Sequence, residues 1–259
     1  PASSTVQLFV DGVASGSTCT ADATTGAWSC DTGVLTAGAK VVTAQATTVL
    51  TEGRVTSTSS GLTVTVDTTL PTVTAFSSST ADGTYGVGAS ISIVATTSEA
   101  IRSGNSLTVT LETGSVDRTV SLTADTAGTS LTGTYQVQNG DTTSDLSVLS
   151  FALVSVSDTA GNAMTSTTVP SGTNNIAGAK AIVIDGVVPT MTVSANPISV
   201  NSGGTSTVTF TASEATSTFE LADVSATLGT LSNFQSVSST SYTATFTASP
   251  SVGGAAAVS

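Results

Sequence analysis

Apolar residues recur at every second position along most of this 259-residue chain. The alternation is clear at Val6, Leu8 and Val10. Successive side chains of an extended strand point to opposite faces, so this period predicts β-strands that are buried on one face. The same pattern returns at 62–66, 91–95, 107–111, 208–212 and 242–246. No convincing helical stripe interrupts it, and we therefore expect an all-β fold.

Turn-forming pairs fall between these runs. They are Asp11-Gly12, Asp82-Gly83, Asn139-Gly140 and Gly203-Gly204. Such pairs favour the tight turns that join antiparallel strands. Many short antiparallel strands at this spacing are typical of β-sandwiches.

One sequence motif occurs twice in the chain. VTVDTTLPTVTAF occupies 64–76, and the related string IVIDGVVPTMTVSA occupies 182–195. Each reads as a strand, an acidic residue, a short stretch, a proline and a new strand, which is the pattern expected where two similar modules join. These junctions divide the chain into segments 1–70, 71–188 and 189–259. We predict a tandem array of β-sandwiches joined by short linkers that contain Asp and Pro.

The composition argues against most kinds of chemistry. The chain has no histidine and only five Lys and Arg, so the commonest acid/base and metal-ligating groups are scarce, and we expect no enzyme. Its net charge of -12 would repel phosphate backbones, so we expect no nucleic-acid partner. No apolar run approaches the roughly 20 residues that span a bilayer, so we expect no membrane insertion.

The two cysteines, Cys19 and Cys30, flank a turn at 24–26 between two strand-like runs. Folding this hairpin about its turn would bring them within reach of a disulfide. We predict that bridge, with a pair of free thiols as the alternative. A bridge would indicate an oxidising, extracellular setting.

Several motifs resemble those of bacterial immunoglobulin-like modules, which occur in tandem in very large surface and secreted proteins, including adhesins and biofilm proteins. The motifs are STVQLFVDG at 4–12 and AKVVTAQATT at 39–48, then LTVTLETG at 107–114 and SDTAGN at 157–162, then STVTFTASEA at 206–215 and YTATFTA at 242–248. The resemblance covers nearly the whole chain. It implies an immunoglobulin-like sandwich in each segment and an extracellular or cell-surface location.

The outer segments depart from the pattern of these modules. The first segment lacks a first strand, and the third stops at Ser259 before a closing strand. We expect the third segment to be an open sandwich, with an unpaired edge and a groove that exposes Phe210 and Phe246. Another molecule or a continuing chain would complete it.

The resemblance also implies a metal site. In such a sandwich the second strand and the loop before the last strand end at the pole that faces the preceding module. Asp67, Glu99 and Asp158 should therefore meet there, with Asn162 in the same loop, and clustered carboxylates suit calcium. The alternative is that Asp158 and Asn162 only form a hydrogen-bonded turn. Asp185 and Glu214 repeat the arrangement at the second junction as a weaker calcium site.

Two further observations concern lysine. An internal isopeptide crosslink would need a buried lysine, and Lys40 and Lys180 each begin a strand beside glycine and alanine, where we expect exposure. Lysine also commonly protects the edge strands of β-sheets, and this chain has almost none to place there. Lateral or end-to-end assembly is one interpretation, and protection by bulges and short edges is the other.

These observations favour a non-catalytic structural stalk or spacer of an extracellular bacterial adhesin-type protein. The alternative is an interlocking subunit of an extracellular filament, sheath, surface layer or phage appendage. A carbohydrate-binding or hydrolytic module is a distant third. The expected partners are other copies of the chain or further modules of the same long chain.

Overall fold

The computed structural model describes residues 4–250 and 253–258. This part of the chain divides into two compact units. One comprises 4–83, 90–135 and 144–183, and the other comprises 84–89, 136–143 and the described residues from 184 onward. Antiparallel sheets dominate both units, which confirms the all-β prediction.

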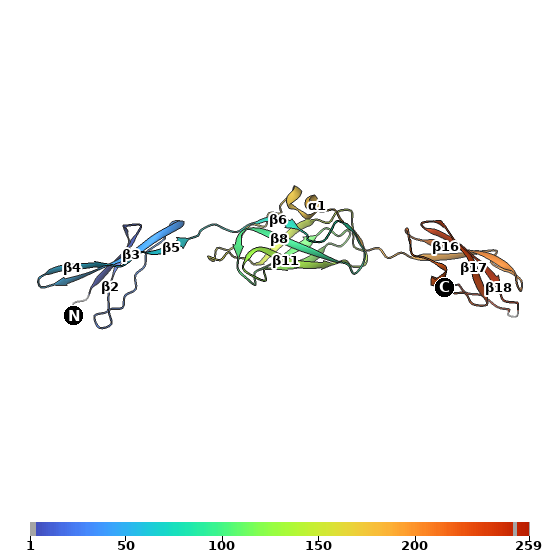
Figure 1. Ribbon diagram of the computed structural model, residues 1–259, viewed down its shortest axis with the longest axis horizontal. Helices are drawn as coiled ribbons and strands as arrows, with labels where there is room; N and C mark the ends of the chain where they lie inside the picture. Colours follow the sequence, from blue (N-terminus) through green and yellow to red (C-terminus); the bar gives the residue numbers. More distant parts are fainter. Residues whose placement is uncertain (1–3, 251–252, 259) are drawn as a thin grey trace. The chain divides into compact units, whose positions relative to one another are not determined.

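The first sheet contains β1 (Thr5–Val10), β2 (Val13–Thr20), β3 (Gly38–Leu50), β4 (Gly53–Thr58) and β5 (Leu62–Val66). Its order is β2-β1-β3-β4, and β5 also pairs with β3. The long strand β3 meets β4 near its end and β5 near its start, as Figure 1 shows. At the turn between β1 and β2, Asp11 and Gly12 both have positive φ, as a two-residue type I′ hairpin turn requires.

The apolar interior of the first sheet is small. Among the described residues before β5, only Val6 and Leu8 are buried hydrophobic side chains. Residues 21–37 contain no strand, although a turn at 23–25 stands almost where we predicted it. The expected hairpin is therefore wrong on its second side, because Cys30 lies in a loop and has no strand partner.

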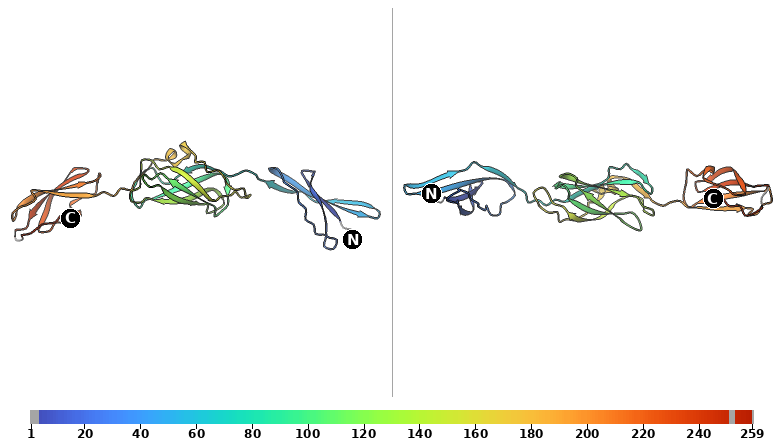
Figure 2. Two further views of the ribbon diagram at one scale, coloured as in Figure 1. Left: turned by 180° about the vertical axis from the view of Figure 1, so that it is seen from behind. Right: turned by 90° about the horizontal axis from the view of Figure 1, so that it is seen from below.

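The middle sheet contains β6 (Val73–Ser77), β8 (Ser90–Ile101), β9 (Ser106–Leu111), β10 (Arg118–Thr123), β11 (Gly128–Gln136) and β13 (Val148–Ser155), in the order β13-β9-β10-β11-β8-β6. Figure 2 shows its strands folded into two facing layers. A small sheet of β12 (Thr142–Thr143), β14 (Ile182–Asp185) and β7 (Gly83–Tyr85) accompanies it, with the one-turn helix α1 (Ile176–Ala179) and the 3-10 turn η1 (Gly172–Asn174). The core of this part of the chain is large. The fully buried side chains there include Phe76, Ile91, Ile93, Ile101, Leu107, Leu111, Leu122, Leu131, Leu146, Ile176 and Ile182.

The last sheet contains β15 (Met191–Asn196), β16 (Thr205–Ala212), β17 (Gly229–Ser238) and β18 (Ser241–Ala248), in the order β15-β16-β18-β17. The 3-10 turn η2 (Leu221–Asp223) lies between β16 and β17. A core of Val208, Phe210, Tyr242, Ala244 and Phe246 lies on one face, with Phe219 and Phe234 packed against it. The expected exposure of Phe210 and Phe246 is wrong, because these aromatic neighbours and Val258 cover the face.

A groove of about 670 Å³ nevertheless opens beside Phe246. Its lining includes Ile198, Val200, Leu228 and the glycine- and alanine-rich residues 253–256. Each of the four sheets lies inside one predicted segment, but the compact units divide the middle segment. The boundaries 1–70, 71–188 and 189–259 stay a prediction.

Candidate metal centre

Three carboxylates from distant parts of the sequence meet in the first compact unit. Asp67 follows β5, Glu99 lies near the end of β8, and Asp158 follows β13. Each offers an oxygen, and these oxygens all lie within 4.8 Å of one another. Asp158 also forms an isolated antiparallel bridge with Ile101, which holds the loop after β13 against the end of β8.

Asp158 organises its own loop. Its Oδ1 accepts hydrogen bonds from the backbone N–H groups of Gly161 at 2.6 Å and Asn162 at 2.8 Å. Gly161 has φ +109°, a conformation that L side chains rarely adopt. The hydrogen-bonded turn that we considered as an alternative to a metal site is therefore present together with the carboxylate cluster.

Asn162 connects this loop to Asp67. Its Nδ2 donates to Asp158 Oδ2 at 2.7 Å and to the backbone carbonyl of Asp67 at 3.1 Å. Asp67 Oδ1 in turn accepts from the N–H of Thr69 at 2.9 Å. In this arrangement Asn162 holds the Asp158 carboxylate and joins it to the main chain of Asp67, and its role as a metal ligand stays a prediction.

The cluster shifts the pKa values of Glu99 and Asp158 in opposite directions. Burial raises the pKa of Glu99, and the neighbouring charges of Asp67 and Asp158 raise it further. Glu99 Oε1 is buried and accepts no hydrogen bond from any described residue. Burial alone would also raise the pKa of Asp158, but hydrogen bonds from the Asn162 side chain and from nearby backbone N–H groups outweigh it and lower that pKa.

The geometry fits one hard cation. Calcium takes carboxylate and carbonyl oxygens at about 2.3–2.6 Å, so two ligands on opposite sides of the ion lie about 5 Å apart. The three oxygens fall within that span. A cation there would partner the unpaired Glu99 oxygen and offset the repulsion that raises the pKa of this residue.

Sequence reasoning did not single out Arg102, which braces the same loop. It follows β8 directly, and its Nη2 donates to the carbonyl of Thr159 at 3.3 Å. Its position in the sequence, three residues after Glu99, could have indicated that it lies near the carboxylate cluster.

The second predicted site remains untested. Asp185 ends β14, and its Oδ1 accepts from the N–H of Val187 at 3.4 Å. Glu214 follows β16, and its Oε1 is buried without a hydrogen-bond partner in the described structure. Within residues 4–250 and 253–258, the group around Asp67 is the one cluster of three or more potential metal-ligating side chains.

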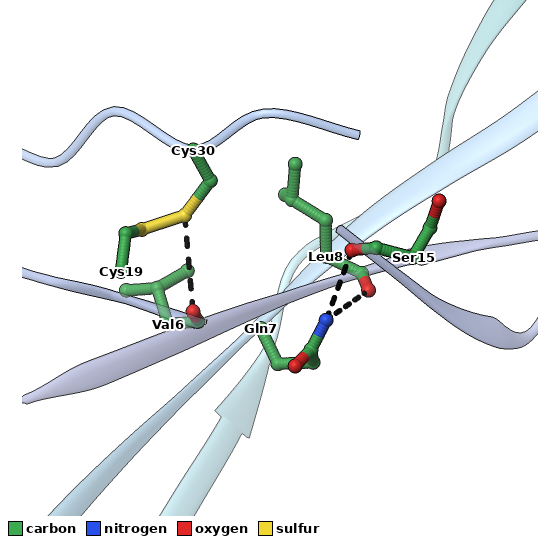
Figure 3. Close-up of a disulfide and its surroundings, with 6 residues drawn as sticks. All are labelled: Val6, Gln7, Leu8, Ser15, Cys19 and Cys30. Atoms are coloured by element: carbon green, nitrogen blue, oxygen red, sulfur yellow. Dashed lines mark hydrogen bonds between the residues drawn. A yellow bond between two sulfur atoms is a disulfide. The ribbon is translucent and has the colours of Figure 1, made fainter. Parts of the chain in front are cut away.

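The cysteines form a disulfide, shown in Figure 3. Cys19 lies in the edge strand β2 and Cys30 in the following loop, with their Cα atoms 5.6 Å apart. Cys30 Sγ lies 3.7 Å from the carbonyl oxygen of Val6. Ser15 Oγ donates to the carbonyl of Thr32 at 2.5 Å, so the loop is held against the sheet at two points.

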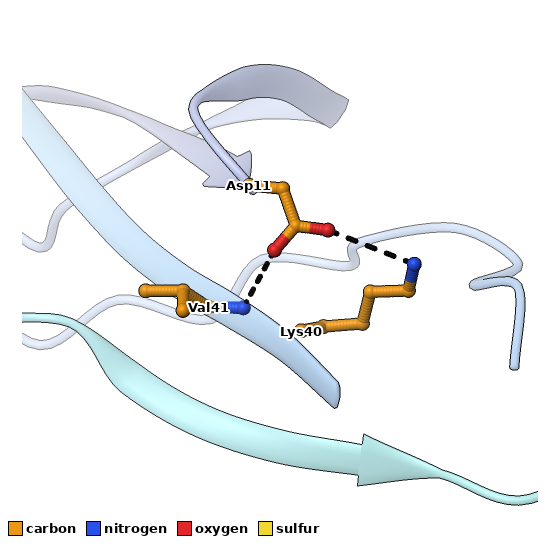
Figure 4. A network of polar contacts seen from close by, with 3 residues as sticks. All are labelled: Asp11, Lys40 and Val41. Carbon is orange, nitrogen blue, oxygen red and sulfur yellow. Dashed lines mark hydrogen bonds and ion pairs between the residues drawn. The ribbon is translucent and has the colours of Figure 1, made fainter. Parts of the chain in front are cut away.

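Lys40 is less exposed than we expected. Its side chain is 17% exposed, and Nζ lies 3.6 Å from Asp11 Oδ2, whose other carboxylate oxygen accepts from the N–H of Val41 at 2.9 Å (Figure 4). The surrounding sheet partly covers the stem of the side chain. Because Asp11 is half exposed, this ion pair contributes at most about 1 kcal/mol.

No helix in the described part of the chain is long and apolar enough to cross a membrane. A search of curated proteins finds no match to the chain. Residues 185–259 match the family model described as Bacterial Ig-like domain. This range includes the whole β15-β16-β18-β17 sheet with its aromatic core. The chain therefore contains a bacterial Ig-like domain at its C-terminal end, as the resemblance implied.

Proposed function

We propose that this chain is a non-catalytic spacer in an extracellular bacterial surface protein. The observation that carries the proposal is the bacterial Ig-like domain at 185–259, a type of domain typical of surface proteins. The disulfide between Cys19 and Cys30 fits an oxidising compartment. A spacer needs stable sheets and no reactive site, which agrees with a chain that has no histidine.

Calcium is the second part of the proposal. Asp67, Glu99 and Asp158 would bind one ion, and Asn162 would hold the Asp158 carboxylate next to the main chain of Asp67. The ion would restrain the linker residue Asp67 against the loop after β13. Extracellular modules need only weak sites, with dissociation constants of about 0.1 to 1 mM.

A module exchange in the intact surface protein tests the spacer role. Residues 1–259 are replaced by unrelated Ig-like modules of equal length, or deleted, and attachment of the cells is measured. A spacer predicts that the exchange restores attachment and the deletion does not. Loss of attachment in both variants would instead show that these residues make a specific contact.

The alternative role, an interlocking subunit of an extracellular assembly, is favoured by one observation. The edge strand β15 carries no charged residue and has all six residues exposed. Electron microscopy of material shed from cells separates the two roles, because a subunit predicts regular filaments or sheets.

A further inference from the structure

The edge strand β15 presents apolar side chains on the core side of its sheet. Met191 pairs with Ala212, and Val193 pairs with Phe210. Directly paired residues share one face of a sheet, so Met191 and Val193 lie on the same face as the buried Phe210. Phe210 is 1% exposed, whereas Val193 is 46% exposed. The apolar face therefore continues past the core to an open edge.

On one side of β15, the backbone N–H and C=O groups pair with no described strand. The N–H of Ser213 donates to the carbonyl of Thr190 at 2.8 Å, so the backbone polar groups of Thr190 point toward β16. These groups alternate in direction along a strand. Those of Met191, Val193 and Ala195 therefore point outward, where no described strand pairs with them.

Charge points to another copy of this chain as the partner. The chain carries -12, yet β15 and the lining of the adjacent groove contain no charged residue. Two copies can thus meet at this edge without bringing like charges together. A charged partner would lose hydration here and find no counter-charge.

The register of such a pair is fixed by the two faces. Antiparallel pairing about a two-fold axis through a residue keeps like faces together, whereas an axis between two residues would join the apolar face to the polar one. An axis through Val193 also lets the outward N–H and C=O groups of both copies exchange hydrogen bonds. Met191 then faces Ala195 of the second copy.

We propose that β15 pairs antiparallel with β15 of a second copy about a two-fold axis through Val193. Two four-stranded sheets become one continuous sheet, and the exposed Met191 and Val193 of both copies pack together. The interface is isologous and closes as a dimer. It requires neither the spacer role nor calcium, so it stands or falls independently of the proposed function.

Crosslinking of the full chain tests the register. In a hydrogen-bonded antiparallel pair the facing Cα atoms lie about 5.5 Å apart, which a disulfide can bridge. Val193→Cys should therefore give a dimer linked through residue 193 under mild oxidation, identified by peptide mapping. Thr192→Cys is the matched control, because it lies on the opposite face and meets Ser194 of the second copy. We expect it to crosslink at least about tenfold more slowly.

Charge insertion tests the interface without crosslinking. Val193→Lys places two ammonium groups beside the axis and should weaken dimerisation more than about tenfold in sedimentation velocity. Val237→Lys puts the same change in β17, at the other edge of the sheet, on a side chain that is also exposed, and should leave the dimer intact. Circular dichroism and melting temperature check that both variants fold. A monomeric parent chain, equal crosslinking of the two cysteine variants, or an intact Val193→Lys dimer would each overturn the proposal.

Discussion

Removing the disulfide should loosen the first sheet while the other sheets stay folded. The perturbation is the double variant Cys19→Ser, Cys30→Ser, which avoids leaving a free thiol. The disulfide joins the loop 21–37 to β2. Among the described residues of this sheet, the buried apolar side chains are Val6 and Leu8. The hydrogen bond from Ser15 Oγ to the carbonyl of Thr32 remains in this variant, and the loop is part of no other sheet, so the effect should be local.

The magnitude follows from the loop length and the small core. The cysteines are 11 residues apart, and closing a loop of that size stabilises the folded state by about 3 kcal/mol in the chain-entropy account. Burial of Val6 and Leu8 contributes about 1.5–3 kcal/mol each. The bridge thus contributes about as much as one of these core side chains or more. Its loss should raise local opening about a hundredfold, since each 1.4 kcal/mol is a factor of ten.

Hydrogen exchange read by mass spectrometry measures this effect strand by strand. Peptides from β1 and β3 should lose protection in the double variant, whereas peptides from β9 and β10 serve as the internal control. Equal loss of protection in all four strands would show that the first sheet does not open independently. Unchanged protection of β1 would refute the idea that the tethered loop stabilises this sheet.

The remaining predictions concern the metal centre and the last sheet. Calorimetric titration should show millimolar or tighter calcium binding, and Glu99→Gln should weaken this binding at least about tenfold. The control variant Glu52→Gln, in the turn after β3, should leave the calcium affinity unchanged. Equal calcium binding by the two variants would exclude the site. Because the folded state raises the pKa of Glu99, it holds this proton more tightly than the unfolded state does, so stability without calcium should fall as pH rises from the usual glutamate range through the raised pKa. Urea titrations of Glu99→Gln should lack that decline, and calcium affinity of the parent chain should drop as acid protonates Glu99. Phe210→Ala should destabilise the last sheet by about 3–5 kcal/mol in thermal unfolding, and a loss below about 1 kcal/mol would contradict its place at the centre of the core.

The sequence was informative wherever one strand face is buried. The alternation at 91–95 and 208–212 became parts of β8 and β16, because a half-buried strand imposes a period of two. The meeting of Asp67, Glu99 and Asp158 was also predictable once the module type had been inferred. Its signal is the combination of a strand end, a linker and a loop that this type of sandwich brings to one pole.

The wrong predictions have a common physical cause. A local sequence pattern does not indicate which distant residues will pack against it. The run after the turn at 24–26 was predicted to be a strand, but it forms no ladder with β2, to which the disulfide and the Ser15–Thr32 hydrogen bond join it, so it remains a loop. Lys40 was expected to be exposed from its neighbours in sequence, yet its side chain is 17% exposed in the folded sheet. Phe210 is covered by Phe219 and Phe234, which come from a loop and an irregular strand with no clear period.

The scarcity of basic residues affects how readily extracellular proteases can cleave this chain. Proteases of trypsin specificity cut after lysine or arginine, and beyond Lys180 the sequence contains neither. The remaining targets are mostly held in ordered strands, since Lys40, Arg54 and Arg118 lie in β3, β4 and β10. A protease must unpair a strand before its backbone can enter an active site. Resistance to such enzymes is thus coupled to the folding of the first two thirds of the chain, while the Ig-like domain at its C-terminal end offers them no target even when unfolded.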